Sequence, residues 1–260
     1  MAKDSQNKKI VVANWKMSPE TIDEAFEILK KVKETAKTLK NTKLVICPPS
    51  LYANELKESL GKSKKILFGA QNVFYEEKGA HTGEISIDMI KNLGMGYVIV
   101  GHSERRILGE DDNIVSKKIN LVLNSKLNAI LCIGEKERSE EGDFLLFISE
   151  QIKNSLHGVE KKYLKNLIIA YEPIWAIGKT AEDAMDSRGV HQMHLFIKKV
   201  LKDLFDEKSS EKVAIIYGGS VELENTEELI ENGNINGFLI GHESLNADKF
   251  CKILKIVDKS

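Results

Sequence analysis

Short runs of apolar, mainly β-branched residues recur along the whole chain, and segments with helical periodicity separate them. Hydrophobic residues at consecutive positions are typical of strands in a parallel sheet that is covered on both faces. We expect eight such strands, at residues 9–14, 44–48, 65–70, 96–101, 129–134, 167–172, 213–218 and 237–241. Amphipathic patterns between them predict helices, most clearly at residues 21–39, 113–125 and 191–205.

This alternation of strand and helix predicts the fold class. Eight repeats within 260 residues favour an α/β fold of the closed (β/α)₈ barrel type over an open, doubly wound sheet. No Gly-x-Gly-x-x-Gly motif follows the first strand, which argues against dinucleotide binding. The chain has only 4 prolines and no linker-like stretch. We therefore expect one barrel domain over residues 1–260.

Composition narrows the class of protein further. Hydrophobic residues make up 42% and charged residues 30%, as in a globular protein that folds in water. A formal net charge of -1 gives no overall field to attract nucleic acid or anionic lipid. No apolar stretch is long enough to span a bilayer, and the first residues lack the apolar core of a signal peptide. Cys47, Cys132 and Cys251 are an odd number at long spacing, which predicts free thiols in a reducing compartment. We expect a cytoplasmic protein with no nucleic-acid or membrane partner.

Polar residues gather where the predicted strands end. The carboxyl ends of all strands in a (β/α)₈ barrel meet at one rim, where the loops build the active site. The residues that end or follow the strands are Asn14, Lys16, Gln71, Asn72, His102, Ser103, Glu104, Glu135, Glu172, Ser220 and Gly241. Positions far apart in the sequence are therefore expected to converge on one small space.

Three of these residues suggest proton transfer next to a carbonyl group. Glu172 is suited to take a proton from carbon if it is held in a dry site. His102 precedes the predicted helical turn "SERR", and a helix N-terminus disfavours the imidazolium, so a neutral ring could donate a hydrogen bond to a carbonyl oxygen. Lys16 offers a cation for an oxyanion or a phosphate.

Two glycine-containing turns suggest a phosphate site. "YGGS" (217–220) and "IGHES" (240–244) follow the last two predicted strands and expose backbone N–H groups. Phosphate sites between these two loops are common in barrels of this type.

Each of these features has a plainer interpretation when it is considered alone. An isolated histidine such as His102 is more often a hydrogen-bonded core residue, and Lys16 could be one more exposed lysine. His191 and His194 have a spacing that could bind metal, but no third ligand lies in register, so we expect no metal site. The shared position at one rim favours the catalytic interpretation.

Several motifs together resemble the triosephosphate isomerase family, nearly end to end and in the family's order. The motifs are "ANWKM" (13–17), "GAQNV" (69–73), "GAHTGEIS" (79–86), "VGHSERR" (100–106), "LCIGE" (131–135), "AYEPIWAIG" (170–178), "YGGSV" (217–221) and "GFLIG" (237–241). The resemblance implies interconversion of D-glyceraldehyde 3-phosphate and dihydroxyacetone phosphate through an enediolate, in glycolysis and gluconeogenesis. It implies no metal and no organic cofactor.

The resemblance also implies a role for each matching residue. The catalytic base falls on Glu172, the electrophile on His102 and the cation on Lys16, with Asn14 at the substrate. The supporting residues are Ser103 and Glu104. The backbone N–H groups expected at the phosphate are those of Gly178, Ser220, Gly241 and His242.

This sequence departs from the family pattern at two places. The family often has a second glycine where this chain has His242, which a backbone contact tolerates if the side chain points away. The closing loop commonly reads Ala-Ile-Gly-Thr-Gly-Lys-Thr-Ala, whereas residues 176–181 read "AIGKTA". Two residues are missing at its tip, between the expected hinges at 173–175 and 179–181. The stretch 182–193 that follows looks longer than usual.

The resemblance further implies a homodimer. The segment "FYEEKGAHTGEIS" (74–86) resembles the family's protruding loop, which inserts into a partner subunit near the partner's Asn14 and Lys16. Thr82 would be its deepest residue.

Two rival functions remain at this point. A metal-dependent sugar-phosphate epimerase would need His and Asp ligands at several strand ends, and the turns "CPP" (47–49) and "YGG" (217–219) offer none. A barrel kept as a binding protein would not need Glu172, His102 and Lys16, although the altered loop leaves this alternative open.

Overall fold

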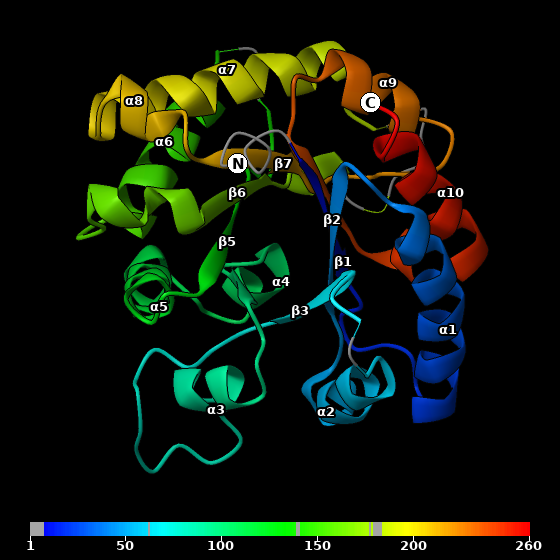
Figure 1. Ribbon diagram of the computed structural model, residues 1–260. Coiled ribbons are helices and arrows are strands. Elements are labelled where there is room, and N and C mark those ends of the chain that lie inside the picture. The colour runs from blue at the N-terminus through cyan, green and yellow to red at the C-terminus, as the bar shows by residue number, and fades with distance from the viewer. Residues whose placement is uncertain (1–7, 62, 139–140, 177, 179–183) are drawn as a thin grey trace.

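In the computed structural model, eight parallel strands close into a barrel in sequence order (Figure 1). The structure describes residues 8–61, 63–138, 141–176, 178 and 184–260. The strands are β1 (Lys9–Asn14), β2 (Thr42–Cys47), β3 (Ile66–Ala70), β4 (Tyr97–Val100), β5 (Asn128–Ile133), β6 (Leu167–Tyr171), β7 (Ala214–Tyr217) and β8 (Gly237–Ile240). Pairing of β8 with β1 completes the ring, with Ile10 opposite Gly237. The (β/α)₈ fold class is confirmed.

Helices surround the barrel and connect successive strands (Figure 1). The α-helices are α1 (Ile22–Thr38), α2 (Ser50–Ser59), α3 (Ile87–Asn92), α4 (Ser103–Ile107), α5 (Asp112–Asn124), α6 (Asp143–Ser155), α7 (Ser187–Leu204), α8 (Glu207–Ser210), α9 (Thr226–Asn232) and α10 (Ala247–Val257). Short 3₁₀ helices are η1 (Lys161–Asn166), η2 (Ile174–Ala176) and η3 (His242–Ser244).

Alternate residues of each strand pack into two separate hydrophobic layers. On β1, Ile10 and Val12 face the barrel interior, where they join residues such as Val45 and Ile99. Val11 and Ala13 face outward and pack in the layer between strands and helices. Both faces of every strand are thus buried, which explains why the strands appear in the sequence as continuous apolar runs.

Helix α7 begins earlier than the sequence pattern predicts. Asp186 caps it, because its Oδ1 accepts a hydrogen bond from the Gly189 N–H at 2.8 Å. Residues 187–193 therefore form the first turns of α7 and do not belong to a long connection. The expectation of an extended loop over residues 182–193 is wrong from residue 187 onward, and residues 182 and 183 lie outside the described part of the chain.

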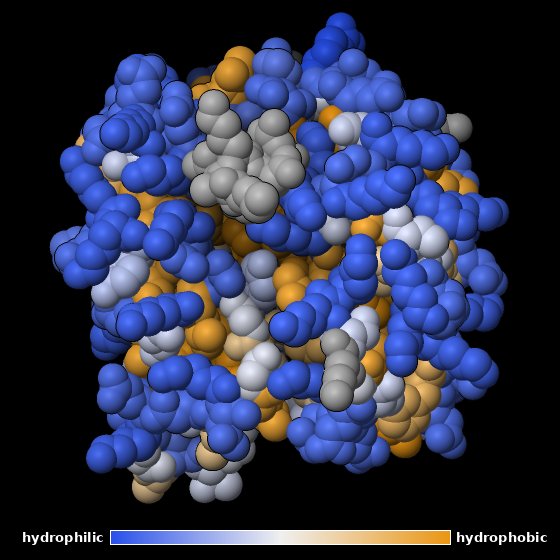
Figure 2. Space-filling model, viewed as in Figure 1, coloured by the Kyte–Doolittle hydropathy of each residue, from blue (hydrophilic) through white to orange (hydrophobic). Residues whose placement is uncertain are grey.

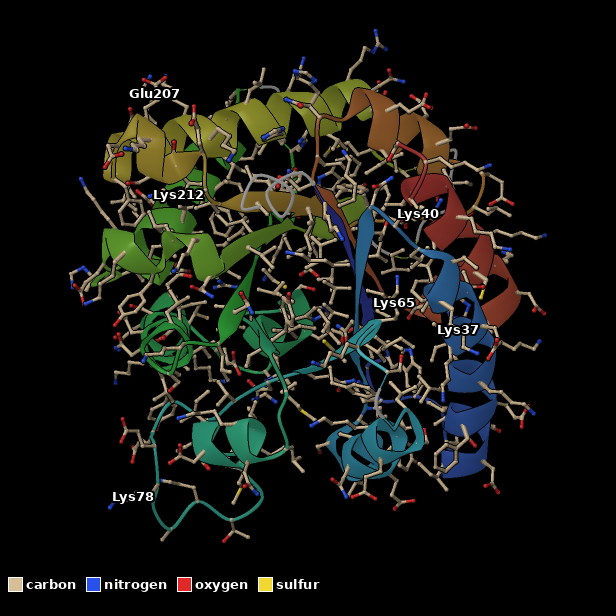
Figure 3. All side chains as sticks on the ribbon, in the orientation of Figure 1. Lys37, Lys40, Lys65, Lys78, Glu207 and Lys212 are labelled. Atoms are coloured by element: carbon tan, nitrogen blue, oxygen red, sulfur yellow. The ribbon has the colours of Figure 1, made fainter. Side chains whose placement is uncertain are left out.

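The side of the barrel where the strands begin is covered mainly by hydrophilic residues. Figure 3 labels Lys40, Lys65 and Lys212, which precede β2, β3 and β7, and Figure 2 shows hydrophobic residues in the hollows between such side chains. The Lys65 ammonium donates to the Leu39 carbonyl at 2.8 Å. Among the described residues, no helix combines the length and the apolar character that crossing a bilayer requires. All three cysteines are free.

The buried His194 on α7 gives a prediction about stability. Burial lowers the pKa of His194 from 6.5 to about 4, and the nearby Lys198 charge acts in the same direction. Above about pH 6.5 the ring is neutral in both the folded and unfolded states. As the pH falls from 6.5 toward 4, the unfolded chain binds a proton that the folded chain does not. The free energy of unfolding should therefore decrease in this window, by less than about 1.4 kcal/mol per pH unit from this one group.

Urea denaturation at several pH values between 7.5 and 4.5 would test this expectation. His194→Gln should flatten the decline, whereas the control His191→Gln, on the same helix but partly exposed, should not. An equally steep decline in His194→Gln would assign the acid sensitivity to other groups.

Candidate active site

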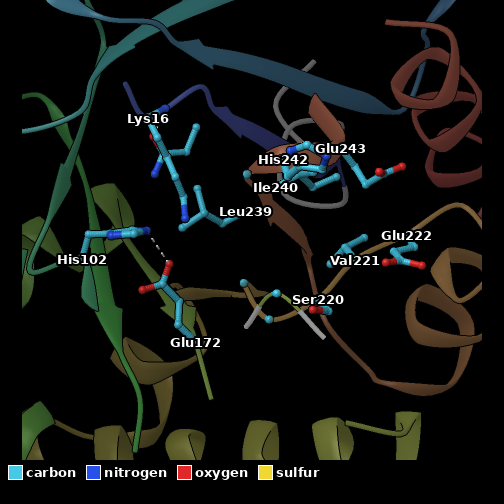
Figure 4. A pocket seen from close by; sticks show the side chains of 15 residues that line it. Lys16, His102, Glu172, Ser220, Val221, Glu222, Leu239, Ile240, His242 and Glu243 are labelled. Carbon is cyan, nitrogen blue, oxygen red and sulfur yellow. Dashed lines mark hydrogen bonds and ion pairs between the residues drawn. The ribbon is translucent and has the colours of Figure 1, made fainter. Parts of the chain in front are cut away.

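A cavity of about 330 Å³ opens where the strands end, and part of the predicted rim lines it (Figure 4). The rim residues that are not in its lining are Gln71, Asn72, Ser103, Glu104 and Glu135. Of the site residues expected from the sequence, those that line the cavity are Asn14, Lys16, His102, Glu172, Gly178, Ser220, Gly241 and His242. They come from the ends of β1, β4, β6, β7 and β8. The structure thus brings together residues separated by more than 200 positions in the sequence.

Glu172 lies at the inner wall of this cavity, directly after β6. It is only 2% exposed, and its backbone N–H donates to the Ile133 carbonyl at 2.7 Å. Its Oε1 lies 3.3 Å from Nε2 of His102, as Figure 4 shows. Its Oε2 accepts a long hydrogen bond, at 3.4 Å, from the backbone N–H of Ser103. The carboxylate is therefore fixed by neighbouring strand ends and shielded from bulk water.

Two glycines make room for Glu172. A Cβ added to Gly134 would lie 1.7 Å from the Glu172 carbonyl oxygen, and one added to Gly218 would lie 2.8 Å from its Cγ. Any larger residue would have to displace the backbone or the side chain of Glu172. The sequence offered a signal for both positions, since each glycine directly follows a strand.

His102 is held with its Nε2 toward the cavity. Its side chain caps α4, because Nδ1 accepts a hydrogen bond from the backbone N–H of Glu104 at 3.2 Å. A nitrogen that accepts carries no proton, so in this arrangement the ring is neutral and its proton resides on Nε2. The Nε2 of His102 lies beside the Glu172 carboxylate, 3.3 Å from its Oε1.

Lys16 occupies a constrained turn after β1. Its backbone has a φ of 53°, which is uncommon for a residue with a side chain. Asn14 stabilises the turn by accepting from the Lys16 N–H at 3.1 Å, and Gln71 donates to the Lys16 carbonyl at 2.8 Å. The Lys16 ammonium pairs with Glu104 at 2.6 Å. Asn14 and Glu104 therefore both position Lys16. Asn14 holds the Lys16 backbone, and the Glu104 carboxylate holds the Lys16 ammonium group.

The turns after β7 and β8 line the rest of the cavity. An added Cβ at Gly241 would lie 3.7 Å from the Lys16 Nζ, so this strand end is next to the cation. The Ser220 hydroxyl donates to the Ala176 carbonyl at 2.8 Å and links β7 to the segment that follows Glu172. Gly178 is exposed and has a φ of 72°. Ile177 and residues 179–183 of the expected closing loop lie outside the described residues.

Sequence reasoning missed two carboxylates at this end of the cavity. Glu222 and Glu243 both line it. Glu243 is paired with Lys249 of α10, with 3.3 Å between Oε2 and Nζ. Glu222 lies outside the quoted motifs, and Glu243 lies inside "IGHES" (240–244), where only the backbone N–H groups suggested a function.

A second missed feature is the cluster that anchors Trp175. The buried Glu135 accepts hydrogen bonds from the Trp175 indole at 3.0 Å and from the Tyr171 hydroxyl at 2.8 Å. Arg138 donates to Glu135 at 2.9 Å and lies over the Trp175 ring, 5.4 Å from its centroid. The polar position after β5 and the tryptophan after Pro173 were the available signals. Together these contacts fix the chain just beyond Glu172.

Among the described residues near the cavity there is a buried thiol but no cluster of metal ligands. Burial raises the pKa of the Cys132 thiol well above its ordinary value, and the Glu172 carboxylate raises it further. In the described ranges, no three His, Cys, Asp or Glu side chains are grouped so that they could hold a metal ion. His194 is buried, and the Nδ1 of His191 lies 3.3 Å from the Asn232 carbonyl oxygen.

Comparison with known proteins gives the same family over nearly the whole chain. Residues 9–257 match the family model described as triosephosphate isomerase. The triosephosphate isomerase of Dictyoglomus turgidum is 41% identical over 253 residues, which cover 95% of this chain and 99% of that protein. That of Aquifex aeolicus is 41% identical over 256 residues, covering 95% and 98%. The resemblance seen in the motifs is confirmed, and the chain belongs to the triosephosphate isomerase family.

Proposed function

We propose that this isomerase interconverts D-glyceraldehyde 3-phosphate and dihydroxyacetone phosphate by proton transfer, with Glu172 as the base and His102 as the hydrogen-bond donor to the substrate oxygen. One observation carries the proposal: the buried Glu172 carboxylate and the Nε2–H of His102 face each other at 3.3 Å in a cavity whose other end is lined by strand-end backbone. A carboxylate and a neutral donor at this spacing can act on adjacent carbon and oxygen atoms of one substrate.

In this mechanism Glu172 removes a proton from the carbon next to the carbonyl group. The electron pair of that C–H bond forms the carbon–carbon double bond of the enediolate, and negative charge develops on the carbonyl oxygen. His102 donates a hydrogen bond to that oxygen, and Lys16 stabilises the charge. The proton of the adjacent hydroxyl group moves to the former carbonyl oxygen, and the electron pair of that O–H bond forms the new C=O bond. The electron pair of the carbon–carbon double bond takes the proton back from Glu172 at the former carbonyl carbon. Atoms and charge then balance without a metal or an organic cofactor.

The phosphate of the substrate binds at the opposite end of the cavity in this proposal. The backbone N–H groups of Ser220, Gly241, His242 and Gly178 are suited to a phosphate, because they donate without carrying a side-chain charge. Gly178 follows the anchored segment at Trp175, so it can cover the phosphate while the Trp175 end of the chain stays fixed. Exclusion of water would let the enediolate be reprotonated before its phosphate is eliminated.

A coupled assay in both directions, with and without a metal chelator, tests the proposed reaction. We expect full activity in the presence of chelator. Loss of activity with chelator, restored by metal, would favour a metal-dependent sugar-phosphate enzyme. Absence of any activity, with normal folding, would favour a barrel retained for binding alone.

The position of Gly178 gives a further prediction. In a crystal structure with a phosphate-bearing analogue of the enediolate, the Gly178 N–H should lie within hydrogen-bond distance of the phosphate. In solution, methylglyoxal released by elimination should be a small fraction of the isomerised product. A Gly178 far from the phosphate, or methylglyoxal in amounts that rival the product, would contradict the proposed role.

We also propose that the active form is a two-fold homodimer. Residues 74–86 extend away from the barrel below α3 in Figure 1, and Thr82 on this loop is exposed. A second cavity, of about 570 Å³, lies beside β3 and is lined by residues that include Gln71, Ile85 and Met89. Met17 is 94% exposed next to the catalytic Lys16. The exposed Met17 and a cavity with apolar lining residues such as Ile85 and Met89 are suited to the loop of a second copy. Thr82 of that loop would lie near Asn14 and Lys16 of the partner subunit.

Sedimentation velocity and activity over a range of protein concentrations test the homodimer. We expect a dimer whose dissociation on dilution lowers activity. Thr82→Arg should shift the equilibrium toward monomer, because a charged side chain would be placed in a closed interface. A fully active monomer would refute the proposed assembly, whereas a larger oligomer built from such dimers would agree with it.

We also propose, from the same substrates, that the protein acts in glycolysis and gluconeogenesis in the cytoplasm. Localisation of a tagged full-length chain in its own cell would test this placement.

A further inference from the structure

His242 is a titratable side chain at the end of the cavity assigned to the phosphate. It is the first residue of η3 and directly follows Gly241 at the end of β8. It lines the cavity while remaining exposed to solvent. In the view of Figure 4, His102, Glu172 and Lys16 lie toward one end, and His242 and Ser220 lie away from them.

No other described residue holds the His242 ring in place. Within the described ranges, its imidazole makes no hydrogen bond and no ion pair, whereas the His102 ring is fixed on both nitrogens. Both of its nitrogens are therefore available to a ligand that enters this end of the cavity.

Two carboxylates lie near His242, so a positive charge on its ring would change the electrostatic potential at the proposed phosphate site. Glu222 and Glu243 line the same part of the cavity and would repel a dianionic phosphate. Glu243 is only 13% exposed and is compensated by Lys249, whose pKa is raised by the hydrogen bond to Glu243. The side chain of Glu222 has no such ion pair among the described residues. A cation on His242 would offset this carboxylate at the place where the phosphate binds.

We infer that the imidazole of His242 contacts the phosphate group of the substrate and that its protonated form binds this group more tightly. The inference rests on the proposed function and adds a charged side chain to a phosphate site otherwise made of backbone N–H groups. Phosphate recognition in this enzyme should then be tighter at pH 6.0 than at pH 8.5, because a protonated imidazole attracts the phosphate dianion.

The other charged and titratable groups that line the cavity are Lys16, His102, Glu172, Glu222 and Glu243, and Lys249 pairs with Glu243. All of them are unchanged in a variant of His242, so any pH dependence that they contribute is common to the wild type and the variant. A comparison of His242 variants with the wild type therefore isolates the contribution of this ring.

Sulfate is a suitable probe, because it remains a dianion over the whole range and the measured pH dependence belongs to the protein alone. We would measure sulfate affinity by calorimetry at pH 6.0 and pH 8.5 for the wild type, His242→Gln and His157→Gln. His157 is an exposed histidine in the connection before β6, on the side where the strands begin, so it serves as the matched control.

The wild type and His157→Gln should bind sulfate about two- to fivefold more tightly at pH 6.0 than at pH 8.5, the range expected for one exposed ion pair. His242→Gln should lose this difference. His242→Gly, which keeps the backbone N–H, should bind sulfate at pH 8.5 within about twofold of the wild type and should also lose the difference.

Parallel pH dependence in the wild type and His242→Gln would overturn the inference and leave the proposed reaction intact. A wild type without isomerase activity would overturn the proposed reaction instead. In the active enzyme, His242→Gln should raise the KM for the triose phosphate at pH 6.0 more than at pH 8.5, with a smaller change in kcat. An effect on kcat alone at both pH values would contradict a role in phosphate binding.

Discussion

Glu172→Asp should fold normally and show a kcat at least about tenfold below that of the wild type. Shortening the side chain by one methylene withdraws the carboxylate from the substrate carbon, and a misplacement of about 1 Å can cost about a hundredfold in rate. The structure gives the carboxylate little freedom to compensate, because Glu172 is buried and its backbone is bonded to Ile133. The end of β6 fixes the backbone of Glu172, so the length of the side chain determines where the carboxylate oxygens lie.

Steady-state kinetics in both directions, with a thermal unfolding curve for each variant, would measure this effect. Glu211→Asp is a matched control, since Glu211 is an exposed glutamate before β7, on the side where the strands begin. It should leave kcat unchanged. A Glu172→Asp enzyme with near wild-type kcat would remove Glu172 from the role of base and would direct attention to another group at the cavity.

The barrel itself could be predicted from the sequence, because the physics of a covered parallel sheet leaves a direct pattern. Both faces of each strand are buried, so residues such as Val11 and Val12 on β1 are both apolar although they face different layers. Glycine or polar residues then mark the strand ends. Since every strand of a barrel ends on the same rim, the meeting of Glu172 with His102 follows from their positions in the chain order.

The contacts around these residues could not be predicted in the same way. The cluster of Glu135, Arg138 and Trp175 depends on side-chain directions across two loops, which no periodicity encodes. The start of α7 was missed because a helix of 18 residues with a strong apolar stripe dominates the pattern, while its first turn is set by one capping aspartate. The orientation of His242 toward the cavity depends on the turn at Gly241, which the sequence alone does not fix.

Lys16 also shows the difference between what the sequence predicts and what only the structure reveals. Its place after the first strand was evident, but its φ of 53° and its support by Asn14 and Gln71 were not. A lysine held in this conformation requires surrounding hydrogen bonds to maintain it. The sequence therefore predicts that Lys16 reaches the site, and the structure shows that residues from the ends of β1 and β3 hold it in place.

His102→Gln should reduce kcat by about 10² to 10⁴, the usual range for loss of a positioned acid or donor, with a small change in KM. The ring is only 7% exposed, and its Nδ1 is occupied by the Glu104 N–H, so its one available function toward the substrate is donation from Nε2. A glutamine amide can also donate, but without the cap at Glu104 its orientation is not fixed. Steady-state constants for both substrates, with His157→Gln as the control, would measure the effect. A rise in KM with unchanged kcat would make His102 a binding residue, since a group that acts only in the transition state changes kcat and kcat/KM together.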